Sequence, residues 1–147
     1  MKLEGDAVFA AAPASIDGQG DRILDQIATT YRAFVDARTR AIPASDHLCT
    51  ACPAVAHLDL KVVLHRGHVV RQAFGSGSDL LGPAVTIAHR LLKNTIRDRI
   101  GFRPYLFLSD AAATGLGVPD VGLAHAEAYA DAGRIGGRIV ELGQPVS

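Results

Sequence analysis

The sequence has few aromatic residues, no tryptophan and no excess of charge of either sign. Aromatic side chains make up 5% of the 147 residues, and 15 basic residues balance 15 acidic ones, so the formal net charge is zero. Surfaces that bind nucleic acids or anionic membranes usually carry a basic excess, and single-strand binding platforms use aromatic rings for base stacking. We therefore expect no nucleic-acid partner and no membrane partner.

Long apolar runs and numerous cysteines are also lacking. No stretch approaches the roughly 18 apolar residues that a membrane helix needs. Glu4 and Asp6 lie where a signal peptide would be apolar. The two cysteines, both in one CTAC stretch, are too few for a disulfide framework. Together these features predict a cytoplasmic protein with reduced thiols.

The apolar residues that are present recur with helix and strand periods, along a chain whose 147 residues fit a single domain. Two short strands are expected around a turn at Gly5-Asp6, followed by a helix from Asp21 to about Arg40. The remaining expected elements are a strand pair over 58–74 that turns at Arg66-Gly67, a helix from Pro83, a strand over 103–108, a helix capped by Ser109 or Asp110, a helical turn over 123–129 and a hairpin over 133–142. This order predicts an α+β fold of ferredoxin-like type, with helices on one face of a mostly antiparallel sheet.

Several polar residues suit the chemistry of a nucleotide. Thr86 and Arg90 are four residues apart in an expected helix, so a hydroxyl and a guanidinium share one face and can contact one triphosphate. Lys93 lies one turn further on, as a surface charge or as another phosphate contact. A lysine donor and an aspartate acceptor can together read a purine edge through paired hydrogen bonds.

Three stretches, KLEGDAVFA, LDLKVVLHRGHVV and GSGSDLLGPAVTIAHRL, resemble the catalytic domains of class III adenylate and guanylate cyclases. The chain is most similar to a bacterial group of cyclase-like proteins of uncharacterised function, whose pattern also includes the Cys-rich loop and the HRLLKN stretch. The similarity extends over about residues 1–142. It implies a homodimer in which each purine nucleotide site forms between two subunits.

The resemblance also implies a role for particular residues. Asp6, in the K-x-x-G-D motif, would be a ligand of Mg²⁺ or Mn²⁺, while Lys2 and Asp79 would contact the purine base. Thr86 occupies the position of a ribose-orienting asparagine, and Arg90 matches the arginine that stabilises the phosphoryl transition state. In such cyclases the ribose 3′-oxygen attacks the α-phosphate and pyrophosphate leaves, with paired metal ions neutralising the developing charge.

Two departures from the cyclase pattern separate the chain from an active enzyme. The family carries a second metal-binding aspartate on a strand upstream of K-x-x-G-D, so this chain holds half of the metal site. Thr86 replaces the usual asparagine, and Pro83 stands where an acidic residue is common. The missing first strand is central in a ferredoxin-like sheet, and its absence would leave strand edges unpaired. We therefore expect the natural polypeptide to start upstream of Met1, or another chain to fill the gap.

These features leave three hypotheses for the function. The first is a cyclase-homology domain with an incomplete metal site, acting as a purine-nucleotide-binding, regulatory or dimerisation module. The second is an active cyclase that converts ATP or GTP into a cyclic nucleotide and pyrophosphate with a divalent metal. Whether the protein is an enzyme stays open between these two hypotheses.

A third hypothesis is a small metal-binding module organised by the Cys-bearing loop. The pattern HxCxxCxxxxH consists of His47, Cys49, Cys52 and His57, which together offer four ligands suited to zinc. Typical structural zinc sites take two well-separated pairs of ligands, whereas these four lie within one short segment. The alternative is a loop whose thiols stay reduced and whose role is purely structural.

Overall fold

The computed structural model describes residues 2–4, 6–41, 52–75, 77–118 and 120–143. The strands are β1 (Lys2–Glu4), β2 (Ala7–Phe9), β3 (Lys61–Leu64), β4 (Val70–Phe74), β5 (Gly77–Leu81), β6 (Tyr105–Ser109), β7 (Leu123–Tyr129) and β8 (Gly133–Glu141). The helices are α1 (Gly20–Ala41), α2 (Cys52–Val55), α3 (Pro83–Leu91), α4 (Ile96–Ile100) and α5 (Asp110–Leu116), with a 3₁₀ turn over Ala14–Ile16. Among the described residues no helix is long and apolar enough to cross a membrane.

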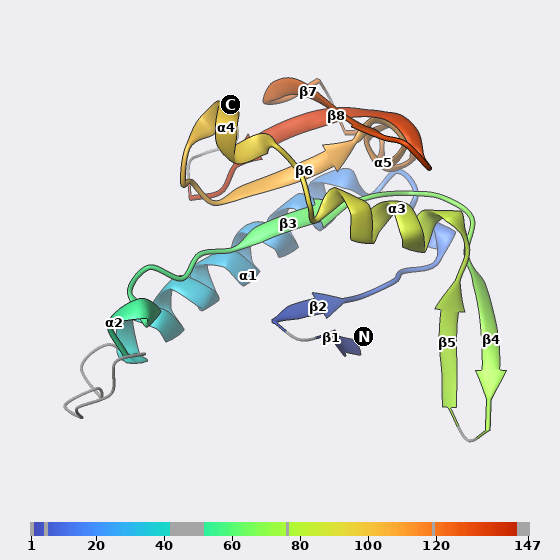
Figure 1. The fold of residues 1–147 in the computed structure, drawn as a ribbon. Helices are drawn as coiled ribbons and strands as arrows, with labels where there is room; N and C mark the ends of the chain where they lie inside the picture. Colours follow the sequence, from blue (N-terminus) through green and yellow to red (C-terminus); the bar gives the residue numbers. More distant parts are fainter. Residues whose placement is uncertain (1, 5, 42–51, 76, 119, 144–147) are drawn as a thin grey trace.

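Four strands form one mixed sheet in the order β3-β6-β8-β7 (Figure 1). β3 and β6 run parallel, while β8 pairs antiparallel with both β6 and β7. Parallel neighbours need a long crossover, and here the chain passes from β3 to β6 through the β4–β5 hairpin and helices α3 and α4. The predicted α+β class is confirmed in this coarse form.

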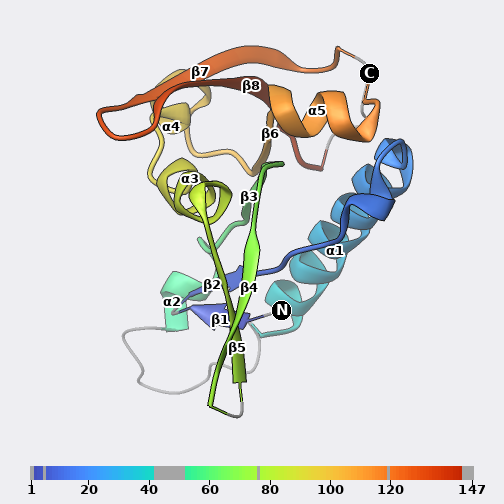
Figure 2. The same ribbon diagram turned by 90° about the vertical axis from the view of Figure 1, so that its right-hand side faces the viewer.

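Helices cover both faces of this sheet, whereas the sequence predicted helices on one face. β6 explains the difference, because every one of its residues is buried. Leu106 and Leu108 pack with residues of α1 and α5, and the alternate residues Tyr105 and Phe107 pack with residues of α3 and α4. Figure 2 shows α1 and α5 on one side of the sheet and α3 and α4 on the other. A strand that is apolar on both sides requires two covering layers.

The helix and cap predictions agree with the structure where local signals are strong. The helix expected from Asp21 to about Arg40 is α1, and the helix expected from Pro83 is α3, with proline in its first turn. Ser109 caps α5, because its Oγ accepts a hydrogen bond from the backbone N–H of Ala112 at 3.3 Å.

The hairpin predicted at Arg66-Gly67 is wrong. β3 pairs with β6, and the segment after it pairs instead with β5, in the register Val70↔Leu81 to Phe74↔Gly77. The turn of this hairpin includes Gly75, whose φ of 56° lies in the left-handed region that favours glycine. The β4–β5 hairpin extends away from the four-stranded sheet in Figure 1, as a separate two-stranded sheet.

Predictions for the C-terminal third also need correction. The expected helical turn over 123–129 is strand β7, and the expected hairpin over 133–142 is one continuous strand, β8. Gly136 and Gly137 lie inside β8 rather than at a turn. A Cβ atom at Gly137 would lie 2.5 Å from the carbonyl oxygen of Leu108, and one at Gly136 would meet the carboxylate of Asp110. These glycines therefore allow close approach of β6 and α5 to the strand.

The outer edge of β3 lies toward the β1–β2 hairpin. The expected pair of strands around Gly5-Asp6 is confirmed, with Lys2 opposite Phe9, and it forms a sheet of its own. Both ribbon views show the hairpin on the side of β3 that is away from β6. In the part of the chain that the structure describes, no strand pairs with this edge of β3.

Candidate functional site

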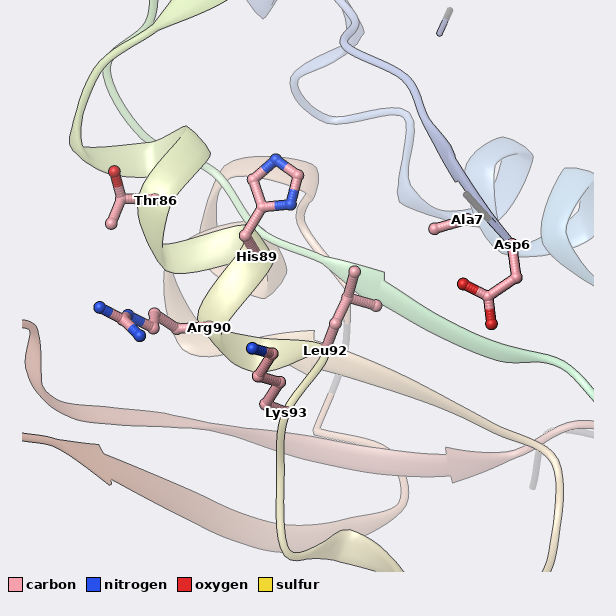
Figure 3. A pocket seen from close by; sticks show the side chains of 7 residues that line it. All are labelled: Asp6, Ala7, Thr86, His89, Arg90, Leu92 and Lys93. Atoms are coloured by element: carbon pink, nitrogen blue, oxygen red, sulfur yellow. The ribbon is translucent and has the colours of Figure 1, made fainter. Parts of the chain in front are cut away.

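A pocket of about 520 Å³ opens between the β1–β2 hairpin and helix α3. This volume is within the usual range for sites that bind small molecules. It is lined by Asp6, Ala7, Thr86, His89, Arg90, Leu92 and Lys93 (Figure 3). The structure thus brings the predicted metal ligand, Asp6, to the same pocket as three predicted nucleotide-contacting residues, which are 80 and more positions further along the chain.

Helix α3 supplies the cationic side of the pocket. Ala84 and Leu91 are buried against the rest of the fold, and Thr86 and Arg90 are exposed one turn apart, as the sequence predicted. Lys93 follows just after the helix ends and is also exposed. Cationic side chains near a helix C-terminus interact favourably with the helix dipole, so this end of α3 suits basic residues.

Asp6 lies at the turn between β1 and β2 and is exposed. The hairpin is held near α3 by Phe9, whose ring stacks on His89 with the centroids 5.4 Å apart. In Figure 3, His89 and Leu92 lie between Asp6 and the side of α3 that carries Arg90. No role in the site is predictable for His89 from the sequence, because its stacking partner lies 80 positions away along the chain.

Arg90 is paired with a residue that the sequence analysis missed. Its Nη2 atom lies 2.7 Å from Oδ2 of Asp131, in the turn between β7 and β8. The two side chains are 48% and 50% exposed. Nothing local in the sequence relates Asp131 to Arg90, since the pairing depends on where β7 and β8 place their turn.

A buried carboxylate anchors the segment that follows α3. Oε1 of Glu127 accepts hydrogen bonds from the backbone N–H and hydroxyl of Thr95, at 2.8 and 3.0 Å, and lies 2.7 Å from Nε2 of His125. Burial by itself raises the pKa of Glu127, but the hydrogen bonds from His125 and Thr95 outweigh it and lower the pKa below its usual value. The carboxylate is therefore charged at neutral pH and holds β7 against the start of α4.

Two tyrosines hold the same segment from the sheet side. The hydroxyl of Tyr105 donates to Oδ1 of Asn94 at 2.9 Å, and the hydroxyl of Tyr129 donates to the carbonyl oxygen of Lys93 at 3.4 Å. Burial, followed by the charge of Glu127, raises the pKa of Tyr129 to about 12. Both hydroxyls are thus protonated donors under physiological conditions, and they fix the backbone that carries Lys93.

Asp79, one of the two predicted base-contacting residues, is not among the described residues that line the pocket. Asp79 lies in β5 opposite Gln72, half-buried, and its Oδ1 accepts a hydrogen bond from the backbone N–H of Leu80 at 3.0 Å. Lys2 lies in β1, and its side chain is outside the described part of the structure. The pocket of one chain therefore unites the candidate metal and phosphate contacts without Asp79.

The predicted zinc ligands fall largely outside the described residues. His47 and Cys49 belong to the segment 42–51, and the side chain of Cys52 at the start of α2 is also outside the description. His57 is exposed. Among the residues that are described, no group of three or more His, Cys, Asp or Glu side chains is arranged to hold a metal ion. Zinc binding, like Mg²⁺ or Mn²⁺ binding, stays a prediction.

The part of the chain that contains the pocket is similar to known proteins. A family model described as "Protein of unknown function (DUF2652)" matches residues 1–99, a range that includes every residue lining the pocket. The uncharacterised protein Rv2561/Rv2562 of Mycobacterium tuberculosis is 30% identical over 112 residues, which is 76% of this chain. The chain spans about 50% of the length of that relative. No solved structure was found to match the chain.

Proposed function

The chain belongs to the DUF2652 family of unknown function, and from the chemistry of its pocket we propose that it is a cyclase-homology domain that binds a purine nucleoside triphosphate. In this proposal Arg90 and Lys93 contact the phosphates and Thr86 contacts the ribose or a phosphate oxygen. In this proposal the domain acts as a nucleotide-binding, regulatory or dimerisation module.

The observation that carries the proposal is the convergence of Asp6, Thr86, Arg90 and Lys93 on one pocket. A guanidinium and an ammonium are the side chains best suited to phosphate oxygens, the first by its fork of N–H donors and the second as a compact charge. Asp6 offers the oxygen ligand that Mg²⁺ or Mn²⁺ prefers, and such an ion normally accompanies a bound triphosphate. The pocket volume of about 520 Å³ suits a ligand of nucleotide size.

A homodimer is part of the proposal, because the cyclase resemblance implies that each nucleotide site forms between two subunits and because Asp79, a predicted base contact, is not among the described residues that line the pocket with Arg90. The β4–β5 hairpin offers an apolar surface for such an assembly, since Val70 and Phe74 are 50% and 55% exposed.

The experiment is a titration of the protein with ATP and with GTP, in the presence of Mg²⁺ or Mn²⁺, by isothermal calorimetry. We expect Arg90→Ala and Lys93→Ala each to lower nucleotide affinity by about tenfold, as removal of a charge-assisted phosphate contact should. Arg97→Ala is the matched control, because Arg97 is exposed on α4, contacts the ring of Phe102 and does not line the pocket.

The same samples are assayed for cyclic nucleotide and pyrophosphate. Binding without product supports the module proposed above. Product that disappears in Asp6→Asn and Arg90→Ala would instead establish the active-cyclase alternative, with the second metal ligand supplied from outside this chain. If the wild-type protein binds neither ATP nor GTP, both the nucleotide-binding module and the active cyclase are excluded.

A further inference from the structure

We infer that Asp131 is a positioning residue of the pocket, whose carboxylate holds the guanidinium of Arg90 and competes with an anionic ligand for it. This inference rests on the proposed function, because it concerns the same pocket. It adds a residue outside the region that the family model matches, since Asp131 lies beyond residue 99.

The geometry of the pair favours competition over permanent pairing. Arg90 lines the pocket, and its Nη2 atom, one of the donors that a phosphate could use, is 2.7 Å from Oδ2 of Asp131. About half of each side chain is exposed, at 48% and 50%. Ion pairs exposed to this degree contribute little net free energy, so a polyanion with several charges can displace the carboxylate.

The turn that carries Asp131 has a fixed position relative to the end of α3. On one side of the turn, Tyr129 donates a hydrogen bond to the carbonyl oxygen of Lys93, and Glu127 accepts two hydrogen bonds from Thr95. The β7 strand and the end of α3 are therefore tied together directly before the turn. As a result Asp131 is held beside Arg90 by these hydrogen bonds, and the pair does not depend on the exposed ion pair alone.

This arrangement has two effects on a ligand. The carboxylate of Asp131 orients the Arg90 side chain. Less conformational entropy is then lost when a phosphate takes the place of the carboxylate. The carboxylate also occupies the guanidinium, and this ion pair must be broken before Arg90 can bind a phosphate. For a polyanionic nucleotide we expect this second effect to dominate, so the carboxylate weakens binding through Arg90.

The test compares Asp131→Asn with the wild-type protein. The substitution keeps the shape of the side chain and removes its charge, and both residues of the pair are too exposed for the fold to depend on them. We expect the affinity for ATP with Mg²⁺ to rise about three- to fivefold at low salt, and the affinity for inorganic tripolyphosphate to rise by a similar factor. The increase should shrink at about 0.5 M salt, because exposed charges are then screened.

Glu141→Gln is the matched control. It makes the same change of net charge, and it also breaks an exposed ion pair, with Arg103 at 2.8 Å. Glu141 lies at the end of β8 that is distant from the β7–β8 turn. A third comparison repeats Asp131→Asn in an Arg90→Gln background, where the carboxylate has no guanidinium to hold and the substitution should change affinity by less than about twofold.

The outcomes separate the two proposals. An increase in Asp131→Asn that exceeds the control and vanishes in the Arg90→Gln background supports the inference. The inference would be overturned if the wild-type protein binds the nucleotide and Asp131→Asn leaves the affinity unchanged, lowers it, or changes it no more than Glu141→Gln does. The proposed function would then still stand. If neither the wild type nor Asp131→Asn binds ATP or tripolyphosphate, both fail.

Discussion

The ring of Phe9 in β2 stacks on the ring of His89 in α3, with the centroids 5.4 Å apart and the planes inclined by 17°. A hairpin of two three-residue strands is marginally stable alone, so its position relative to α3 depends on contacts of this kind. The stack therefore sets the distance between Asp6 and the cationic end of the helix.

Replacement of Phe9 by alanine tests this relationship. We expect Phe9→Ala to release the β1–β2 hairpin, so that backbone amides of residues 7–9 exchange with solvent at nearly unprotected rates, because an aromatic pair contributes about 0.5–1.5 kcal/mol beyond its buried area. Amides of β6 and β8 should keep their protection. Val8→Ala is the control, since Val8 is 61% exposed and points away from the stack. Equal exchange in the two variants would show that the stack does not hold the hairpin.

The buried Glu127 predicts a dependence of stability on pH. Its hydrogen-bonded carboxylate has a pKa below the 4.5 of a free side chain, so the unfolded state binds a proton more readily than the folded state. The stabilisation is complete above about pH 4.5 and is lost as the pH falls through the lower folded-state pKa.

Urea unfolding at a series of pH values measures this effect. We expect Glu127→Gln to lower the free energy of unfolding by about 1–2 kcal/mol at pH 7 and to flatten its decline in acid, because charge-assisted hydrogen bonds are lost. Glu141→Gln removes a carboxylate from an exposed pair and should cost less than about 0.5 kcal/mol. An acid slope as steep in Glu127→Gln as in the wild type would contradict the assignment.

A second pH effect comes from His65. Its Nδ1 lies 3.0 Å from Oγ of Ser109, whose oxygen also accepts the N–H of Ala112, so the hydroxyl hydrogen is free to donate to a neutral imidazole. Burial lowers the pKa of His65 below 6.5. The unfolded chain therefore takes up a proton first, and stability should decline as the pH falls from 6.5 through the folded-state pKa. His65→Gln should remove this decline, and His68→Gln, at an exposed position, should retain it.

The close approach at Gly137 predicts a large cost for a single methyl group. A Cβ atom there would lie 2.5 Å from the Leu108 carbonyl oxygen and 2.6 Å from the ring of Phe107, in a strand with neighbours on both sides. We expect Gly137→Ala to lower the free energy of unfolding by about 2 kcal/mol or more. Gly77→Ala should change it by less than about 0.5 kcal/mol, since the added atom meets an ordinary contact at 3.8 Å. Thermal unfolding of both variants decides the point, and similar midpoints would refute the steric argument.

The sequence predicted the elements whose signals are local. Helix α1 has a continuous apolar face and α3 begins with proline, so the sequence predicts both ends of α1 and the start of α3 within a residue or two. The end of α3 at Leu91 differs, since the apolar pattern that continues to Ile96 belongs to a separate helix, α4. The parallel pairing of β3 with β6 was not predictable in this way, because it joins segments about 40 positions apart and depends on the packing of α3 and α4 between them. The predicted helical turn over 123–129 is wrong: alanine and glutamate in this segment favour helices, but the pairing of β7 with β8 along its whole length outweighs that preference.

The same distinction holds for the pocket. The spacing of Thr86 and Arg90 within one helix predicts that they share a face, and Asp6 is a candidate through the resemblance of K-x-x-G-D to the cyclase motif. Asp131 and His89 acquire their roles only when distant segments meet, the first through the β7–β8 turn and the second through Phe9. Side chains that act on a site only through contacts in the folded protein show no periodic pattern in the sequence, so the sequence does not predict them.

The outer edge of β3 has a consequence for how the protein behaves in concentrated solution. Val62, Val63 and Leu64 form an apolar strand without proline or glycine, and Lys61, the charged residue next to them, directs its Nζ to the carbonyl oxygen of Leu92 at 2.6 Å. Unpaired apolar edge strands of this kind act as templates for cross-β association between molecules. A strand added to this edge of β3 would therefore also protect the protein from self-aggregation, and the yield of monodisperse material would measure how completely that edge is covered.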